Sequence, residues 1–412
     1  MIEELRRADI VMERIAALAN CSDDPGSISR LFGTAAFQKA STLLVAWMKE
    51  AGLKTIVDNI GNVRGKYLSE DPFAKTFVIG SHFDSVINAG KFDGPLGIII
   101  GIDLAKNLIS QNKKLPFHLE CVAFSDEEGV RFHTAYLGSK VLAGTLEKSI
   151  LQKADADGIT IEKVIHDIGG DVNNLAQDSI SADDWLGYYE IHIEQGPVLY
   201  EKDIPIAIVS GIAAQKRIEV YFWGEAGHAG TVPMNMRSDA LCSAAECIIE
   251  VERYAKTKGD KFVATIGKLN IPDSASNVIP GKVICTLDLR SIDSILLSDC
   301  TQYILKHITD ICINRNIILE WKVVQETEPV VCDHAFTGLL KEAIEENQYN
   351  VVELISGAGH DAVAISAVAP VSMLFVKCFK GISHNPKENV EIEDIAAAIK
   401  VSDTFLQKLI IK

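Results

Sequence analysis

Hydrophobic residues follow two different patterns along this 412-residue chain, and the change between them restricts the fold more than any other property. In residues 1–210 and 330–412, continuous apolar runs such as TFVIGSH, FHLECVAF and VSMLFV alternate with helix-like stretches. Apolar runs of this kind are typical of strands buried on both faces, and helices between them indicate a largely parallel sheet. We therefore predict an α/β domain from these two segments.

Residues 211–329 follow the second pattern. The stretch KRIEVYFWG alternates apolar and polar residues, and FVATIGKL, VICTLDLR and IILEWKVV come later, separated by two long helical stretches. Alternation is typical of strands with one exposed face, as in an antiparallel sheet that carries helices on its other face. The sequence thus predicts a smaller α+β domain over 211–329, inserted into the α/β domain of 1–210 and 330–412.

Composition narrows the choice of partners. The chain has 40 basic and 56 acidic residues, a net charge of −16, which argues against nucleic acid and against anionic membranes. Its nine cysteines lack CxxC spacing, which disfavours a disulfide framework and favours a reducing cytoplasm. The first 20 residues are typical of an amphipathic helix rather than a signal peptide, and PLGIIIGIDLA is too short to span a bilayer. We expect a cytoplasmic protein with a small-molecule ligand.

Four clusters of polar residues follow predicted strands of the α/β domain. They contain His82, Asp84 and Asp93; Asp126, Glu127 and Glu128; His192 and Glu194; and His384. Each cluster alone has an ordinary explanation, such as a solvated acidic pair, a core histidine or a turn. Together they lie at the strand ends where open α/β folds bind ligands. A mixed set of imidazoles and carboxylates suits zinc or manganese.

The number of candidate ligands predicts two metal ions rather than one. A single catalytic zinc needs three protein ligands and an open position, whereas five candidates are present: His82, Asp93, Glu128, His192 and His384. Asp93 is the best bridge because its loop is flanked by glycines, and a carboxylate has two oxygens. Asp84 suits a supporting role beside the His82 imidazole. Of the neighbours Glu127 and Glu128, one can bind metal while the other takes a proton from water.

Several longer motifs resemble a known group of enzymes. GSHFDSVINAGKFDGPLG, FSDEEGVRF, HIEQGPVL, GHAGTVPMNMRSDA, SASNVIPG, DLR, SGAGHDA and GISHNPKE occur in order between about residues 75 and 392. This set resembles the amidohydrolases that cleave N-carbamoyl compounds. The group includes allantoate amidohydrolase, N-carbamoyl-L-amino acid amidohydrolase and β-ureidopropionase, within a dinuclear metallopeptidase clan.

The resemblance implies a role for each matching residue. One metal ion is held by His82, Asp93 and His192, and the other by Asp93, Glu128 and His384. Glu127 is then the acid/base. The implied substrate contacts are Gln195, His228, Asn277 and Arg290. The resemblance also implies that the inserted domain forms a homodimer and that His228 acts in the partner's site. In aminopeptidase relatives a carboxylate replaces His192, so a histidine there points to the carbamoyl-cleaving branch.

These observations predict an enzyme that hydrolyses the ureido (carbamoyl) C–N bond of a small carboxylate with two divalent ions, zinc or manganese. WLGYYEIHIEQGPVL and PDSASNVIPG favour allantoate, with release of ammonia and carbon dioxide in purine catabolism. N-carbamoyl-L-amino acids and β-ureidopropionate are the close alternatives. A dinuclear aminopeptidase or dipeptidase, and a non-enzymatic binding protein on the same fold, are more distant ones.

Some residues keep an alternative explanation or have no assigned role. Arg290 also suits a surface salt bridge, Asn277 a turn, and His228 a loop histidine that braces its own turn. His360 and Asp361 receive no role from the sequence.

Overall fold

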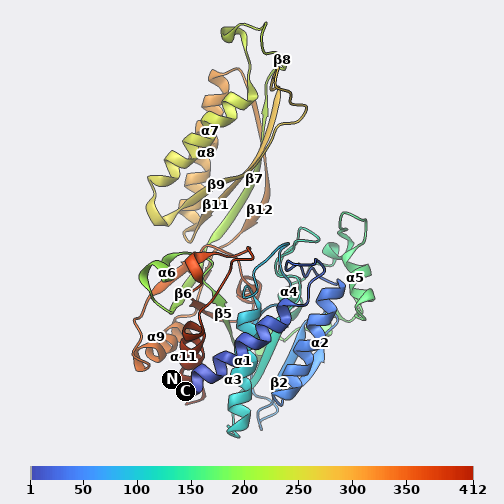
Figure 1. Ribbon diagram of the computed structural model, residues 1–412, viewed down its shortest axis with the longest axis vertical. Coiled ribbons are helices and arrows are strands. Elements are labelled where there is room, and N and C mark those ends of the chain that lie inside the picture. The colour runs from blue at the N-terminus through green and yellow to red at the C-terminus, as the bar shows by residue number, and fades with distance from the viewer. Residues whose placement is uncertain (1, 412) are drawn as a thin grey trace. The chain divides into compact units, whose positions relative to one another are not determined.

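The computed structural model describes residues 2–411, which fall into two compact units (Figure 1). The first unit extends to Ser210 and resumes at Cys332, and the second is Gly211–Val331. The chain leaves and re-enters the first unit at neighbouring points, because the Cys332 amide donates a hydrogen bond to the Ser210 carbonyl at 3.1 Å. The second unit is therefore an insertion with adjacent entry and exit.

The first unit is built around a nine-stranded sheet. Its strands are, in sheet order, β1 (Lys54–Val57), β2 (Val63–Tyr67), β4 (His118–Phe124), β3 (Thr76–His82), β5 (Trp185–Ile193), β15 (Val371–Val376), β6 (Ile206–Ile212) and β13 (Val330–Val331), with β14 (Glu353–Ser356) paired to β6. The four central strands β4, β3, β5 and β15 are parallel. The outer strands pair antiparallel, so the sheet predicted to be largely parallel is parallel only at its centre.

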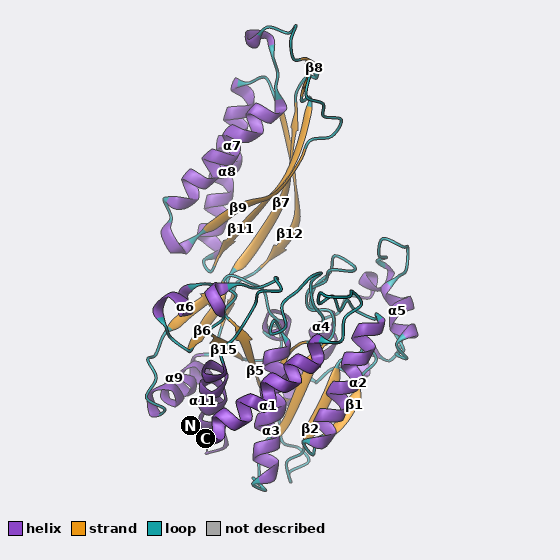
Figure 2. Cartoon of the chain, in the orientation of Figure 1, coloured by secondary structure: helices purple, strands orange, loops and turns teal. Residues whose placement is uncertain are grey.

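Helices cover both faces of this sheet (Figure 2). The longer ones are α1 (Ile2–Ala19), α2 (Ala35–Glu50), α3 (Pro95–Ser110), α9 (His334–Glu346) and α11 (Ile392–Ile411). Their apolar side chains share one core with Ile79 and Ile191 of the sheet. The opposite face carries α10 (Asp361–Ile365), whose Ala362 amide donates to the Glu190 carboxylate at 3.0 Å. The remaining short helices are α4 (Leu137–Ala143), α5 (Ile161–Asp167) and α6 (Val198–Lys202).

The inserted unit has its own sheet and core. A four-stranded antiparallel sheet has the order β12 (Ile318–Thr327), β7 (Ala214–Trp223), β11 (Lys282–Ser291) and β9 (Val263–Asn270). Burial alternates residue by residue along β11, and its inward side chains pack with α7 (Ala240–Lys256) and α8 (Ser294–Asn314). Two short strands, β8 (Gly227–His228) and β10 (Val278–Ile279), pair with each other. The predicted fold class, an α/β unit with a smaller α+β insertion, is confirmed.

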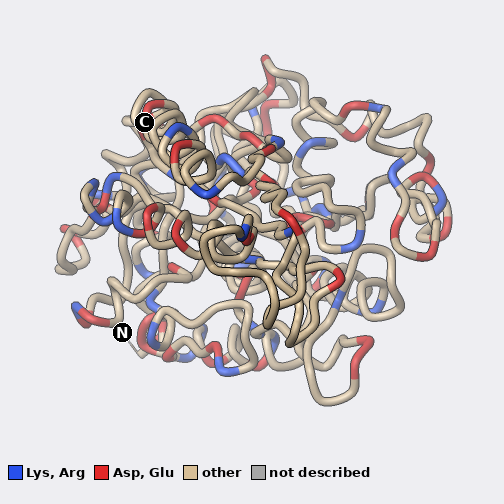
Figure 3. The backbone as a smooth tube through the Cα atoms, turned by 90° about the horizontal axis from the view of Figure 1, so that it is seen from above, with Lys and Arg blue, Asp and Glu red and all other residues tan. Residues whose placement is uncertain are grey.

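Charged residues are distributed without a dominant region of one sign in the view from above. Figure 3 shows Lys and Arg interspersed with Asp and Glu along the tube. Within residues 2–411, none of the helices is both long and apolar enough to cross a membrane.

Helix α3 approaches strand β5 so closely that a side chain does not fit between them. A Cβ atom added to Gly97 would lie 2.0 Å from the carbonyl oxygen of Ile191, far inside van der Waals contact. By contrast, a Cβ atom on Gly338, inside helix α9, would meet nothing within 4 Å. Glycine is therefore required at position 97, whereas position 338 has room for a side chain.

We predict that Gly97→Ala lowers the free energy of unfolding by at least about 2 kcal/mol, because α3 has to move away from the sheet. Gly338→Ala should raise it by about 0.5–1 kcal/mol, because alanine restricts the unfolded chain and favours the helix. Urea unfolding followed by circular dichroism measures both changes. A Gly97→Ala protein as stable as the parent would contradict the close packing described above.

Candidate metal centre

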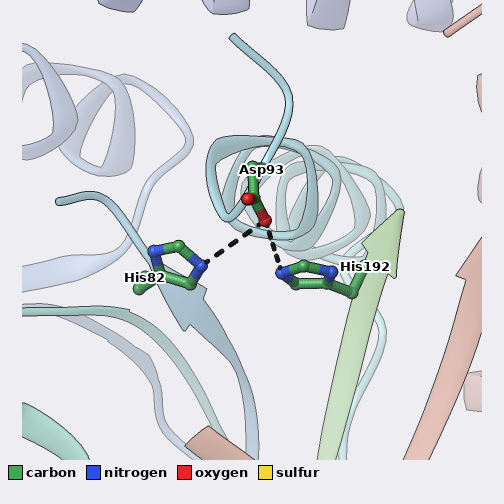
Figure 4. A group of neighbouring side chains, drawn as sticks. All are labelled: His82, Asp93 and His192. Atoms are coloured by element: carbon green, nitrogen blue, oxygen red, sulfur yellow. Dashed lines mark ion pairs between the residues drawn. The ribbon is translucent and has the colours of Figure 1, made fainter. Parts of the chain in front are cut away.

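Three buried side chains meet at the carboxyl ends of two parallel strands (Figure 4). His82 ends β3, His192 lies near the end of β5, and Asp93 lies in the loop that enters α3. Figure 4 shows both imidazoles pointing toward the Asp93 carboxylate. Oδ1 of Asp93 lies 3.9 Å from Nε2 of His82 and 3.2 Å from Nε2 of His192. One carboxylate oxygen thus faces two imidazole nitrogens.

The other oxygen of Asp93 faces a second group. Oδ2 lies 3.0 Å from Nε2 of His384, and that nitrogen lies 3.6 Å from Oε1 of Glu128. Asp93, Glu128 and His384 therefore form a second set with ligand atoms within 4.8 Å of one another, as His82, Asp93 and His192 form the first. A third such set consists of His82, Glu127 and Glu128. The first two sets share Asp93, with one oxygen for each.

The loop between β3 and α3 can take this path only with glycine at its end. Gly94 has a φ of 84°, which is the left-handed region that other residues avoid. A Cβ atom there would also lie 2.4 Å from the His82 carbonyl oxygen and 2.6 Å from its ring. Gly94 therefore lets the chain turn back directly over His82, which brings Asp93 to the imidazole.

A divalent cation fits this arrangement. Nδ1 of His192 lies 2.9 Å from the Ile193 carbonyl oxygen and donates to it, so in the neutral imidazole Nε2 presents a lone pair. Nε2 is buried and lies 3.2 Å from Oδ1 of Asp93, and this carboxylate raises the pKa of His192 despite its burial. A cation between the two atoms, either a proton or a metal ion, stabilises this arrangement. Ligand atoms around a tetrahedral zinc ion with bonds of about 2.0 Å lie about 3.3 Å apart, close to the observed separation.

Glu127 and Glu128 follow strand β4 and are held by Asp84. The Asp84 carboxylate accepts hydrogen bonds from the amides of Glu127 and Glu128 at 3.0 and 3.1 Å. The nearest oxygen to Nδ1 of His82 is the Asp84 carbonyl at 3.3 Å, whereas its carboxylate is 3.6 Å away. The support of His82 expected from the Asp84 carboxylate remains a prediction, while its hydrogen bonds join the loops after β3 and β4.

The carboxyl groups that follow strand β4 have raised pKa values, because the positive charges around them do not offset their burial. Burial raises the pKa of Glu127 well above its ordinary value. Burial and the charge of Asp93 raise the pKa of Glu128 to about 7. Burial likewise raises the pKa of Asp126, and Oδ2 of Asp126 has no hydrogen-bond partner. A bound divalent cation opposes these shifts because it stabilises the charged carboxylates.

Two polar side chains complete the surroundings of Asp93. Nε2 of Gln195 lies 3.0 Å from both Asp93 oxygens, and the Ser383 hydroxyl lies 3.0 Å from Oδ2. Gln195, predicted as a substrate contact, thus faces the predicted bridge. Ser383 was not singled out from the sequence, although its position directly before His384 was a signal for it.

A second layer lies beneath His192. The ring of His360 is 4.5 Å from that of His192, and its Nε2 lies 2.8 Å from the Ser356 hydroxyl. Asp361 is fully buried, and burial together with the charge of Glu190 raises its pKa well above the ordinary range. His360 and Asp361, to which the sequence assigns no role, are thus buried residues, and the ring of His360 packs against that of His192.

The three remaining predicted residues belong to the inserted unit. His228 lies opposite Val278 in the β8–β10 pair, and the Ala229 amide donates to the Asn277 carbonyl at 2.9 Å. The structure therefore brings His228 and Asn277 together. Nδ1 of His228 accepts a hydrogen bond from Gly230 N–H at 3.0 Å, which leaves the proton on Nε2.

Arg290 lies near the end of strand β11, in the four-stranded sheet rather than in the β8–β10 pair. Its guanidinium donates to the two oxygens of Asp288 at 2.8 and 3.3 Å. The strands β8 and β10 continue the β7–β11 pair beyond Lys282, and eight residues of β-strand from Lys282 to Arg290 span about 26 Å. His228 and Asn277 therefore lie far from Arg290 within one inserted unit.

Comparisons with known proteins agree with this geometry. A model of peptidase family M20/M25/M40 matches residues 75–408. Allantoate deiminase 1 from Glycine max is 39% identical, over 97% of this chain and 89% of that protein. N-carbamoyl-L-amino acid amidohydrolase from Geobacillus stearothermophilus is 35% identical, over 94% of this chain and 95% of that protein.

Solved structures show the same fold along almost the whole chain. An amidase of the hydantoinase/carbamoylase family from Burkholderia multivorans has a TM-score of 0.90 and 32% identity, covering 98% of both chains. The structure of AtUAH in complex with glyoxylate has a TM-score of 0.85 and 31% identity, again over 98% of both chains. The resemblance inferred from the motifs is thereby confirmed. This chain belongs to peptidase family M20/M25/M40 and is one of its amidohydrolases, which act on carbon–nitrogen bonds other than peptide bonds.

Proposed function

We propose that the protein hydrolyses the ureido C–N bond of a small carboxylate, with allantoate as its substrate. The observation that carries the proposal is the pair of ligand sets that share Asp93, with His192 in one of them. Relatives named allantoate deiminase, 37–39% identical over 95–97% of the chain, support allantoate. All nine cysteines are free thiols, which agrees with the reducing cytoplasm as its compartment.

Two divalent cations, zinc or manganese, are the proposed cofactors. His82 and His192 would hold one ion and Glu128 and His384 the other, with Asp93 shared between the two sets. When bound, such ions polarise a carbonyl group and lower the pKa of water. The imidazole and carboxylate ligands suit either metal. Asp84 keeps Glu128 and the neighbouring Glu127 in place through its two amide hydrogen bonds.

Glu127 is the proposed acid/base. It is excluded from both sets that share Asp93, so its carboxylate is left to take a proton and pass it on. Glu127 removes a proton from water as the oxygen attacks the ureido carbon, and it then protonates the leaving nitrogen. The C–N bond breaks, and the ureido carbon leaves as carbamate, which decomposes to ammonia and carbon dioxide.

The substrate contacts in this proposal come from two chains. Arg290 presents a planar fork suited to a carboxylate, Gln195 lies beside Asp93, and His228 offers its Nε2–H to the oxyanion with Asn277 next to it. One inserted unit does not bring His228 and Arg290 to one small substrate, because about 26 Å separate the two ends of β11. A homodimer in which His228 acts in the partner's site resolves this separation.

N-carbamoyl-L-amino acids are the second candidate substrates, because amidohydrolases with that name are 35–36% identical over 94–96% of the chain. β-Ureidopropionate and small peptides are the further alternatives. The substrate assay below separates all of these.

With the manganese- or zinc-loaded protein, we expect kcat/KM for ammonia release from allantoate to exceed that for N-carbamoyl-L-amino acids and β-ureidopropionate by at least about tenfold. The second ureido group of allantoate has additional hydrogen-bonding atoms, and lost contacts of this kind are costly. Dipeptides serve as the negative control and are followed by amine release. If N-carbamoyl-L-amino acids are hydrolysed faster than allantoate, they are the substrates instead.

Glu127→Gln and Glu128→Gln form a matched pair of variants. Glu127→Gln should retain both metal ions and lose about 10²–10⁴-fold in kcat, because it removes the proton carrier and leaves the ligands in place. Glu128→Gln should bind less metal, because an amide oxygen is a weaker ligand than a carboxylate. Metal analysis of the dialysed proteins and rate assays decide the roles. If Glu127→Gln turns over at nearly the parent rate, Glu127 is not the acid/base.

Mixing two inactive variants tests whether His228 acts in the partner chain. His228→Ala chains combined with Glu127→Gln chains form mixed dimers in which one site lacks both groups and the other is intact. With equal amounts and full exchange, about a quarter of parent activity should return. Native mass spectrometry monitors the exchange. No recovery despite proven exchange would mean that His228 acts within its own chain.

A further inference from the structure

The loop that carries Asp93 is held at its main chain by Glu388. Oε1 of Glu388 accepts hydrogen bonds from the amides of Phe92 and Asp93 at 2.7 and 3.1 Å. Its Oε2 lies 3.2 Å from the Ser383 hydroxyl, and that hydroxyl lies 3.0 Å from Oδ2 of Asp93. Glu388 therefore contacts the main chain of Asp93 directly. The Ser383 hydroxyl lies between the two carboxylates and donates its single proton to one of them at a time.

The fit around Glu388 is close. Only 3% of its surface is exposed, and a Cβ atom on Gly90 would lie 2.2 Å from its carboxyl carbon. The segment that carries Glu388 is itself closed, because the Phe379 amide donates to the Asn389 carbonyl at 2.7 Å. The carboxylate thus fills a defined space between two loops that are almost 300 residues apart in the sequence.

Burying a carboxylate in this place has a cost. Burial and the charge of Asp93 raise the pKa of Glu388 to about 7. Among the described residues, no Lys or Arg lies within ion-pair distance of it. The hydrogen bonds from the two amides, together with the Ser383 hydroxyl, therefore stabilise the buried carboxylate of Glu388.

Ordinary helix capping does not explain these contacts. Asp333 makes the same kind of bond, with one oxygen accepting from the amides of Ala335 and Phe336 at 2.9 and 3.0 Å, but those amides open helix α9. Phe92 and Asp93 lie before α3, which begins at Pro95. Glu388 instead fixes the one residue whose two oxygens face both ligand sets.

We propose that Glu388 is a positioning residue of the metal centre, which sets the main chain of Asp93 and thereby the position of its carboxylate. The inference rests on the proposed two-metal function. A bridging carboxylate has to satisfy two ions at once, so a small displacement of its backbone affects both. Groups that support metal ligands in this way typically contribute about 10–100-fold to metal affinity.

Three substitutions of Glu388 separate position from charge. Glu388→Gln keeps an oxygen that accepts both amides, and we expect its Mn²⁺ affinity to stay within about threefold of the parent. Glu388→Asp keeps the charge but is one methylene too short, and Glu388→Ala removes the acceptor. Both should lose about 10–100-fold in affinity. The probe is MnCl₂ added to chelator-treated protein, with free Mn²⁺ measured by electron paramagnetic resonance.

Two further measurements exclude a general loss of structure. Asp333→Ala removes a matched two-amide contact at α9 and should leave Mn²⁺ affinity unchanged while it lowers stability by about 1 kcal/mol. Amide hydrogen exchange in a peptide that covers residues 89–94 should be faster in Glu388→Ala than in the parent. Circular dichroism checks that each variant is folded.

The outcomes distinguish this inference from the proposed function. If the parent takes up neither Mn²⁺ nor Zn²⁺, the proposed function fails and the inference with it. If the parent binds two ions and Glu388→Asp binds them as tightly, only the inference fails. Glu388→Gln as weak as Glu388→Asp would also overturn it, because charge rather than geometry would then matter. Should Glu388→Ala not fold, the Asp and Gln variants still decide.

Discussion

The structure of the first unit depends on the burial of the Asp93 carboxylate between imidazoles. A buried carboxylate is unfavourable unless charges or hydrogen bonds compensate it. Asp93 faces His192 with one oxygen and His384 with the other, while Gln195 and Ser383 contact it from the side. The positive φ of Gly94 brings Asp93 over His82, and the hydrogen bonds of Asp84 hold the neighbouring loop of Glu127 and Glu128. The two candidate ligand sets that share Asp93 are placed where a divalent cation would compensate the remaining negative charge.

The parallel centre of the sheet is what assembles these loops. Strands β4, β3, β5 and β15 are neighbours in the sheet and run in the same direction, so their carboxyl ends share one edge. The residues at and after these ends come from distant parts of the sequence and meet at this edge. The antiparallel outer strands carry none of the ligands and extend the hydrophobic support.

Much of this centre was predictable from the sequence, because the candidate ligands belong to short motifs at or soon after the ends of apolar strands, as in GSHFD or SDEE. The predicted ligand sets correspond to groups that the fold brings together. The contacts of Glu388 with Phe92 and Asp93 were not predictable, because they depend on how two remote loops pack. The rotation of Gln195 toward Asp93 and the antiparallel edges of the sheet depend on long-range hydrogen bonds in the same way.

The hydrogen bond between Ser210 and Cys332 also bears on how such a protein can evolve. A short turn between these two positions would reconnect the first unit at the loss of only the end of β6 and the two-residue strand β13, and insertions are tolerated where entry and exit are adjacent. This arrangement lets the inserted unit behave as a module. The hydrolytic core and the module can then diverge at different rates, with new specificity arising in the module alone.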